Sequence, residues 1–177
     1  MKQLIQHISE WRYNKSKMIV SIAKDFNDLT RLINIKYEAN PHYLDLRDID
    51  VSNIKDFNQK NVYLVAHRRH KQKQAFELYG LFAGCDSEVI DVTGWKLDNA
   101  YDISNMFYHC ESLKEIKGID DWDVSNVTDI RWMFLGCENL RNINLSKWKF
   151  KGEVEMDDTF KRCDNSIIPS WYRGDIS

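Results

Sequence analysis

One spacing of largely apolar residues recurs four times between Leu78 and Cys163. The positions i, i+3, i+4 and i+7 of each copy form the stripe that an amphipathic helix presents to a core. The cysteines that close the copies stand 25, 27 and 26 residues apart, and a fixed period of this size is typical of a solenoid. The stripes are Leu78, Leu81, Phe82 and Cys85; Ile103, Met106, Phe107 and Cys110; Ile130, Met133, Phe134 and Cys137; Met156, Thr159, Phe160 and Cys163. We therefore expect a short helix in each copy.

A β-type run follows each of the first three stripes, at 89–92, at 113–116 and at 140–145. Polar turns then lead the chain to the next copy. A tryptophan stands eight residues before three of the stripes, and this regular position predicts core residues that stack on one another. They are Trp95, Trp122 and Trp148. The alternation of helix, strand and turn predicts an α/β fold whose strands stack into a sheet.

Two stretches, residues 122–140 and 102–113, closely resemble the bacterial surface-protein repeat of BspA-like proteins, a leucine-rich-repeat variant with a period of about 26 residues. The resemblance covers roughly residues 44–171. It implies an α/β solenoid of about four repeats of 25–27 residues that is used for protein recognition, and it implies no catalytic residue. Members of that family are commonly exported, whereas this N-terminus contains no uninterrupted apolar segment of a signal peptide.

The first 41 residues do not follow the repeat, as is typical of a segment that covers the open end of a solenoid. Residues 18–22 form a β-type run. A helix is predicted to begin after Asp25 and to end at Asn40, before a proline. Two sets of apolar residues have helical spacing: Leu4, Ile8 and Trp11, and then Phe26, Leu29, Ile33 and Tyr37. The sequence thus predicts one structural domain, with an α+β N-terminal cap at 1–41 and a short leucine-rich-repeat solenoid at 42–177.

An insertion at about residues 58–77 interrupts the first repeat, because the stripe that should begin at Phe57 begins at Leu78 instead. Insertions in repeat proteins map to loops, often on the binding face. This one holds five Lys or Arg residues and one acidic residue. We expect the basic side chains of its 67–73 run to contact a partner: Arg68, Arg69, Lys71 and Lys73. The alternative is a nucleic-acid-associated protein that places them on phosphates.

The charge distribution argues against broad nucleic-acid binding. The net charge is −2, but residues 1–80 carry +5 and residues 81–177 carry −7. A polyanion would be repelled by the acidic half, whereas a protein with a mixed surface would not.

No constellation of catalytic residues is present. The chain has no nucleophile elbow and no glycine-rich phosphate loop, and His109 and Cys110 are neighbours whose side chains point in different directions on a helix. His67 and His70 have ligand spacing, but no third ligand accompanies them, and the cysteines form no C-x-x-C pair. We therefore expect no enzyme activity, no metal, no cofactor and no small-molecule substrate, and four reduced cysteines buried as small hydrophobic residues.

The surface is then the source of function. On strands that bury alternate residues, the remaining side chains face outward. They are Arg47, Glu88, Asp91, Lys114, Lys117, Arg141 and Asn144. Of these, Arg47, Lys117, Arg141 and Asn144 are predicted partner contacts, together with Trp132, which stands beside the apolar stripe and would be an aromatic anchor if exposed.

The chain is expected to be a non-enzymatic protein-protein interaction module. The longest apolar run, residues 18–23, is too short to cross a bilayer, so a cytoplasmic protein without a membrane partner is expected. Small cytosolic binders include inhibitors encoded by phages and mobile elements. A protein of that type would occupy a host complex, for example one that handles nucleic acid.

Overall fold

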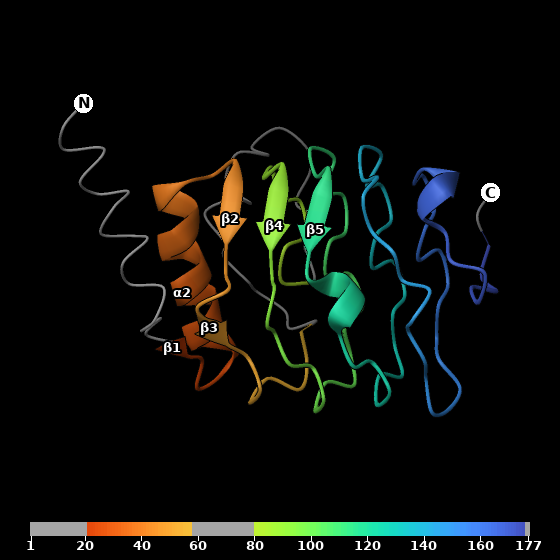
Figure 1. Ribbon diagram of the computed structural model, residues 1–177, viewed down its shortest axis with the longest axis horizontal. Helices are drawn as coiled ribbons and strands as arrows, with labels where there is room; N and C mark the ends of the chain where they lie inside the picture. Colours follow the sequence, from red (N-terminus) through yellow and green to blue (C-terminus); the bar gives the residue numbers. More distant parts are fainter. Residues whose placement is uncertain (1–20, 58–79, 176–177) are drawn as a thin grey trace.

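The computed structural model describes residues 21–57 and 80–175 (Figure 1). Its regular elements are one α-helix, five short strands and two 3-10 helices: β1 (Ser21–Ile22), α2 (Phe26–Ala39), β2 (Tyr43–Asp45), β3 (Ile49–Asp50), β4 (Val89–Asp91), β5 (Glu115–Lys117), η3 (Ile119–Asp121) and η4 (Asn165–Ile167). The strands form two small parallel sheets, β1-β3 and β2-β4-β5. In Figure 1, α2 stands at one end beside β2, and successive coils of the chain lead away from it toward the C-terminus.

Helix α2 forms as the sequence predicts. The carboxylate of Asp25 caps its first turn by accepting a hydrogen bond from the Asp28 amide at 2.8 Å. One face of the helix is buried, and it contains Phe26, Leu29, Ile33 and Tyr37. The helix ends before Asn40, because Pro41 disfavours helical geometry in the residue before it. This part of the N-terminal prediction is confirmed, whereas residues 1–20 lie outside the described residues.

The three-stranded sheet pairs equivalent residues of successive copies. Leu44, Ile90 and Ile116 stand opposite one another and are all buried. The next copy lies beside β5 but has no regular strand geometry. A hydrogen bond joins the two, from the Arg141 amide to the Lys114 carbonyl at 3.2 Å. Alternation along the strands thus places one row of side chains in the core and leaves the flanking rows on the outer face, as the sequence predicts.

The predicted α/β leucine-rich-repeat solenoid is wrong. The described residues contain two small parallel sheets and one α-helix, α2, which lies outside the copies. The stripe segments are successive turns rather than helices. The stripe side chains that the structure describes are nevertheless buried, except for the half-buried Met156 and Cys163, so the spacing correctly indicated the core but not the backbone.

Positive φ angles explain why no helix forms in the copies. Two residues of every copy, at positions i+2 and i+6 of the stripe, have left-handed backbone geometry, which a right-handed helix does not tolerate. They are Gly80 and Gly84, Asn105 and His109, Trp132 and Gly136, and Asp158 and Arg162. The amides then point to the neighbouring copy: Phe107 N–H donates to the Met133 carbonyl at 2.9 Å, and Phe134 N–H to the Thr159 carbonyl at 3.0 Å.

Two ladders of aromatic rings fill the core. The first comprises Phe82, Phe107, Phe134 and Phe160, with centroids 5.2 to 5.6 Å apart. The second comprises Trp95, Trp122, Trp148 and Trp171, with centroids 6.3 to 6.5 Å apart. Stacked rings bury large apolar areas and set the spacing of the copies. The predicted stacking of the tryptophans is therefore confirmed, and Trp171 extends it by one ring.

The four cysteines are free thiols, three of them buried and Cys163 half-buried. Three donate to the phenylalanine carbonyl of the preceding copy, at 3.0, 3.0 and 2.9 Å: Cys110 to Phe82, Cys137 to Phe107 and Cys163 to Phe134. Burial raises the pKa of Cys85 and of Cys163 to about 12, so both stay protonated at neutral pH. The predicted burial is confirmed for Cys85, Cys110 and Cys137 and only partly for Cys163.

Within the described part of the chain, no helix combines the length and the apolar character that a bilayer crossing requires.

Candidate protein-interaction surface

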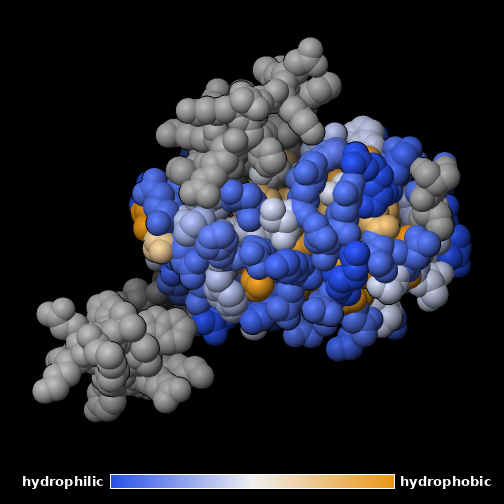
Figure 2. Space-filling view, turned by 90° about the horizontal axis from the view of Figure 1, so that it is seen from above, coloured by the Kyte–Doolittle hydropathy of each residue, from blue (hydrophilic) through white to orange (hydrophobic). Residues whose placement is uncertain are grey.

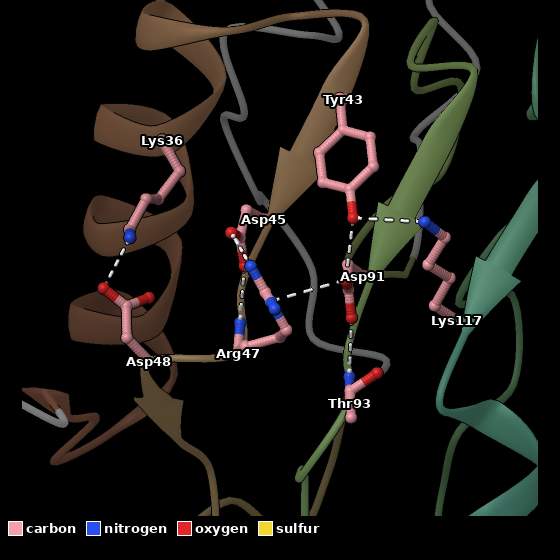
Figure 3. A network of polar contacts seen from close by, with 8 residues as sticks. All are labelled: Lys36, Tyr43, Asp45, Arg47, Asp48, Asp91, Thr93 and Lys117. Atoms are coloured by element: carbon pink, nitrogen blue, oxygen red, sulfur yellow. Dashed lines mark hydrogen bonds and ion pairs between the residues drawn. The ribbon is translucent and has the colours of Figure 1, made fainter. Parts of the chain in front are cut away.

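A polar network covers the outer face of β2, β4 and β5 (Figure 3). We call it the strand-face network; its members are Tyr43, Asp45, Arg47, Asp91 and Lys117. Strand alternation explains its position: Tyr43 and Asp45 flank the buried Leu44 on β2, and Asp91 stands opposite both Asp45 and Lys117 in the sheet register. Four of the five side chains are half-buried, and Asp91 is fully buried.

Asp91 is the centre of the network and is only 3% exposed. Its Oδ2 accepts a hydrogen bond from the Tyr43 hydroxyl at 2.8 Å and lies 3.4 Å from Arg47 Nε. Its Oδ1 accepts the Thr93 amide at 3.1 Å. A buried carboxylate without such partners would cost several kcal/mol, so these three contacts allow it to remain in place.

Arg47 forms a two-point contact with Asp45. Its Nε and Nη2 donate to the two carboxylate oxygens at 2.9 and 2.7 Å. This hydrogen bond lowers the pKa of Asp45 and raises the pKa of Arg47, so both groups are charged at neutral pH. The fork geometry fixes the guanidinium more firmly than a single contact would.

Tyr43 joins Asp91 to Lys117 across the sheet. The Lys117 Nζ donates to the Tyr43 hydroxyl at 3.3 Å and lies 5.0 Å from the centroid of the tyrosine ring. Burial, followed by the bond to Asp91, raises the pKa of Tyr43, so the hydroxyl keeps the proton that it donates. The bond to Tyr43 raises the pKa of Lys117, which therefore stays cationic.

Further charges on this side of the molecule form separate pairs. Lys114 and Glu88 are 2.7 Å apart, Arg141 and Asp164 are 3.2 Å apart, and Lys36 and Asp48 are 2.5 Å apart. Of these, the more exposed pairs Lys114–Glu88 and Arg141–Asp164 contribute little to stability. They do neutralise the face locally, so that cations and carboxylates alternate on it.

The structure brings together only some of the predicted contact residues. Arg47 and Lys117 belong to the strand-face network. Arg141 lies one copy further on, and besides Asp164 it contacts the Glu138 and Leu140 carbonyls. Asn144 accepts the Ser146 amide at 3.1 Å, which is a local turn contact.

The other predicted contacts are Trp132 and the basic residues of the insertion. Trp132 belongs to a stripe segment, is 38% exposed and has the Arg131 guanidinium 5.7 Å from its ring. The four basic residues of the insertion, Arg68, Arg69, Lys71 and Lys73, lie outside the described residues.

Sequence reasoning missed two members of the network, Tyr43 and Asp45. Both share the strand period with Arg47, so the alternation around Leu44 and Leu46 contained the signal. It also missed a row of carboxylates at equivalent positions of successive copies, which pair as isolated parallel bridges: Asp56, Asp102, Asp129 and Glu155. Arg131 neutralises the later part of the row, at 2.6 Å from Asp129 and 3.4 Å from Glu155.

The negative charge of Asp102, in the same row, is stabilised less than that of Asp129. It accepts the Ser104 amide at 2.9 Å and the Ser104 hydroxyl at 2.7 Å. Burial, with smaller contributions from Asp129 and Asp56, nevertheless raises its pKa. The ionised form of Asp102 is therefore less favourable in the folded protein than in water.

The face of the molecule seen in Figure 2 is mainly hydrophilic. Figure 2 shows the described residues from above, with hydrophobic colour limited to small separate spots. Among the described residues, the large hydrophobic side chains that are exposed are Ile22, Ile35, Tyr101 and Trp132. A hollow of about 390 Å³ opens beside η3 and is lined by acidic residues, Trp122 and two lysines. The geometry thus favours polar contacts over a broad apolar interface.

Chemistry at His109 and Cys110 is disfavoured by their placement. The His109 Nδ1 faces Glu111 Oε1 at 3.5 Å, whereas the Cys110 thiol is buried and donates to the Phe82 carbonyl. In residues 21–57 and 80–175, no three His, Cys, Asp or Glu side chains converge as metal ligands would.

Residues 76–172 match the family described as Mycoplasma protein of unknown function, DUF285. The match covers more than half of the 177 residues, so the chain belongs to this family. No curated protein and no solved structure matches the chain.

Proposed function

We propose that the chain is a non-enzymatic interaction protein that binds another protein through the outer face of β2, β4 and β5. The observation that supports this most is the strand-face network, in which hydrogen bonds hold five polar side chains in place on and next to paired strands. Binding requires ordering of interface side chains, which costs about 0.5 to 1.5 kcal/mol for each long side chain. A face that is ordered before binding avoids much of that cost.

The mixture of charges supports a protein partner over a nucleic acid. Phosphate backbones bind surfaces on which several cations act together. Here Arg47 and Lys114 are each paired with a carboxylate at 2.7 Å, and Asp91 lies between Arg47 and Tyr43. An alternating pattern of charges is complementary to another alternating pattern, which is the arrangement of a specific polar protein interface.

Four free thiols support placement of this protein in the cytoplasm. Disulfides form in oxidising compartments, whereas thiols persist in reducing ones. A binder that covers a contact surface of a host complex would act there as an inhibitor.

The test is capture of partners from a lysate of the source organism, followed by binding measurements with each purified candidate. The blocking variant is Val89→Arg, which places a long cation in the outer row between Tyr43 and Glu115. The control is Trp132→Ala, away from this face. A true partner should lose at least about tenfold in affinity for the blocking variant and less than about twofold for the control, since truncation of central contacts costs more than 1 kcal/mol. Equal affinities for all three proteins would contradict the proposal.

A further inference from the structure

Lys117 differs from the other cations on this side of the molecule, Arg47, Lys114 and Arg141, in having no carboxylate at ion-pair distance. Arg47, Lys114 and Arg141 lie 2.7, 2.7 and 3.2 Å from carboxylate oxygens. In the part of the chain that the structure describes, no carboxylate oxygen lies within 4.0 Å of the Lys117 ammonium group. Its polar contact is the Tyr43 hydroxyl, as Figure 3 shows.

The ammonium group is nevertheless held in place. The Tyr43 ring lies beneath it at 5.0 Å, and the Tyr43 hydroxyl is itself fixed because it donates its proton to Asp91. An ammonium group has three N–H donors, and this contact uses one of them. Lys117 therefore presents a fixed cation with two unused donors at the outer face of the sheet.

The surroundings determine which anion fits. Asp91 lies opposite Lys117 in the sheet register, and Glu115 stands two residues before it on the same side of β5. A polyphosphate chain reaching Lys117 would bring its neighbouring charges close to these carboxylates, and like charges placed together cost several kcal/mol. A single carboxylate on an otherwise uncharged segment brings one negative charge instead of several, so it meets much less of this repulsion.

We propose that Lys117 is the anchor point for one aspartate or glutamate side chain of the protein bound at the strand face. This inference rests on the proposed function and adds the chemical character of the partner. The carboxylate accepts the two unused N–H donors, while the Tyr43 ring and hydroxyl keep the ammonium group in position.

The inference is tested with displayed random peptides of about 12 residues, a length that crosses a sheet of this width when extended. They are selected on the whole chain. We expect the enriched peptides to share an acidic residue at one fixed position. Lys117→Gln should weaken their binding about tenfold, the effect of removing one close charge pair. Lys114→Gln is the matched control, because Lys114 already has Glu88 as its partner, and it should change affinity less than about twofold.

A charge exchange makes the test specific. Lys117→Glu should abolish binding of the acidic peptide, and a peptide with lysine at the fixed position should recover it. Melting midpoints show that each variant is folded.

The failures are distinguishable. Peptides that lose binding to Val89→Arg but bind Lys117→Gln as well as wild type would overturn the carboxylate anchor and leave the proposed function intact. Peptides indifferent to both variants, or no enrichment at all, would overturn both. Preferential binding of an oligothymidylate of roughly 20 nucleotides, with the steep salt dependence of phosphate contacts, would also overturn both.

Discussion

Each copy has a strand side and a stripe side, and the apolar pattern of the sequence predicts the backbone geometry of the first but not of the second. On the strand side, β2, β4 and β5 alternate buried and outward residues, and the sequence period predicts their geometry. On the stripe side, the buried residues have helical spacing, but the backbone forms successive turns with left-handed residues. Both sides pair with the next copy through hydrogen bonds that run between copies.

The spacing of apolar residues indicates which side chains are buried, but two different backbone conformations give the same spacing. A helix returns to one face after three or four residues. A pair of turns, each ending in a left-handed residue, does so as well. The difference lies at the left-handed positions, which a helix would not contain.

The largest expected effect is on the stripe side. Phe134→Ala should lower the free energy of unfolding by roughly 3 to 5 kcal/mol, because the ring is fully buried between Phe107 and Phe160. Urea denaturation followed by tryptophan fluorescence measures the change. An unaltered midpoint would show that the phenylalanine ladder does not hold the copies together.

A smaller effect is expected on the strand side at Gly118, which follows β5 with φ of 83°. An added Cβ would lie 2.4 Å from the Thr93 Cα, so Gly118→Ala requires the backbone to move and should cost about 2 to 4 kcal/mol from strain and overpacking. Gly94→Ala is the matched control: its φ is 91°, but nothing lies within 4 Å of the added atom. It should cost about 1 to 2 kcal/mol, the left-handed penalty alone. Equal losses in thermal unfolding would show that the close contact is unimportant.

Much of the strand side was predictable, and the reason is its local period. Arg47, Asp91 and Lys117 were expected on one outward face, and they lie in one network. Their pairing was not predictable, because it depends on which copies stand side by side across the insertion. Helix α2 was predictable because its apolar face, N-cap and terminating proline all agree.

The stripe side was not predictable from the same kind of signal. Glycine marks some left-handed positions, such as Gly80 and Gly84, but Trp132 and Arg162 occupy the equivalent ones in other copies. An isolated glycine in an apparently helical pattern is tolerated, so it gave little warning. The tertiary hydrogen bonds between copies determine the backbone there, and no local pattern encodes them.

The two sides also differ in how a carboxylate affects stability as the pH changes. Asp91 on the strand side has Arg47 and Tyr43 as partners, whereas Asp102 beside the stripe has a pKa raised by burial. A raised pKa means that the folded protein binds the proton more tightly than the unfolded chain does. The ionised Asp102 therefore reduces stability once the pH rises above its unfolded value near 3.8.

Asp102→Asn should accordingly stabilise the protein at pH 7, by less than about 1 kcal/mol because the group is only half-buried. The Asn oxygen can still accept the Ser104 hydrogen bonds. The gain should decline as the pH falls through the raised pKa and disappear below the unfolded value. Thermal melts from pH 3 to pH 8 measure it, and a gain that grows at low pH would contradict this account.

The most direct test of the central claim, that the copies consist of left-handed turns and not helices, compares two substitutions at Arg162. This residue is exposed with φ of 60°, and both changes remove its contact with Glu138 equally. In a left-handed position glycine is favoured over alanine by about 1 kcal/mol, whereas in a helix alanine is favoured over glycine by about the same amount. Urea denaturation should therefore find Arg162→Gly more stable than Arg162→Ala. The opposite order would show that this segment is helical and would contradict the account.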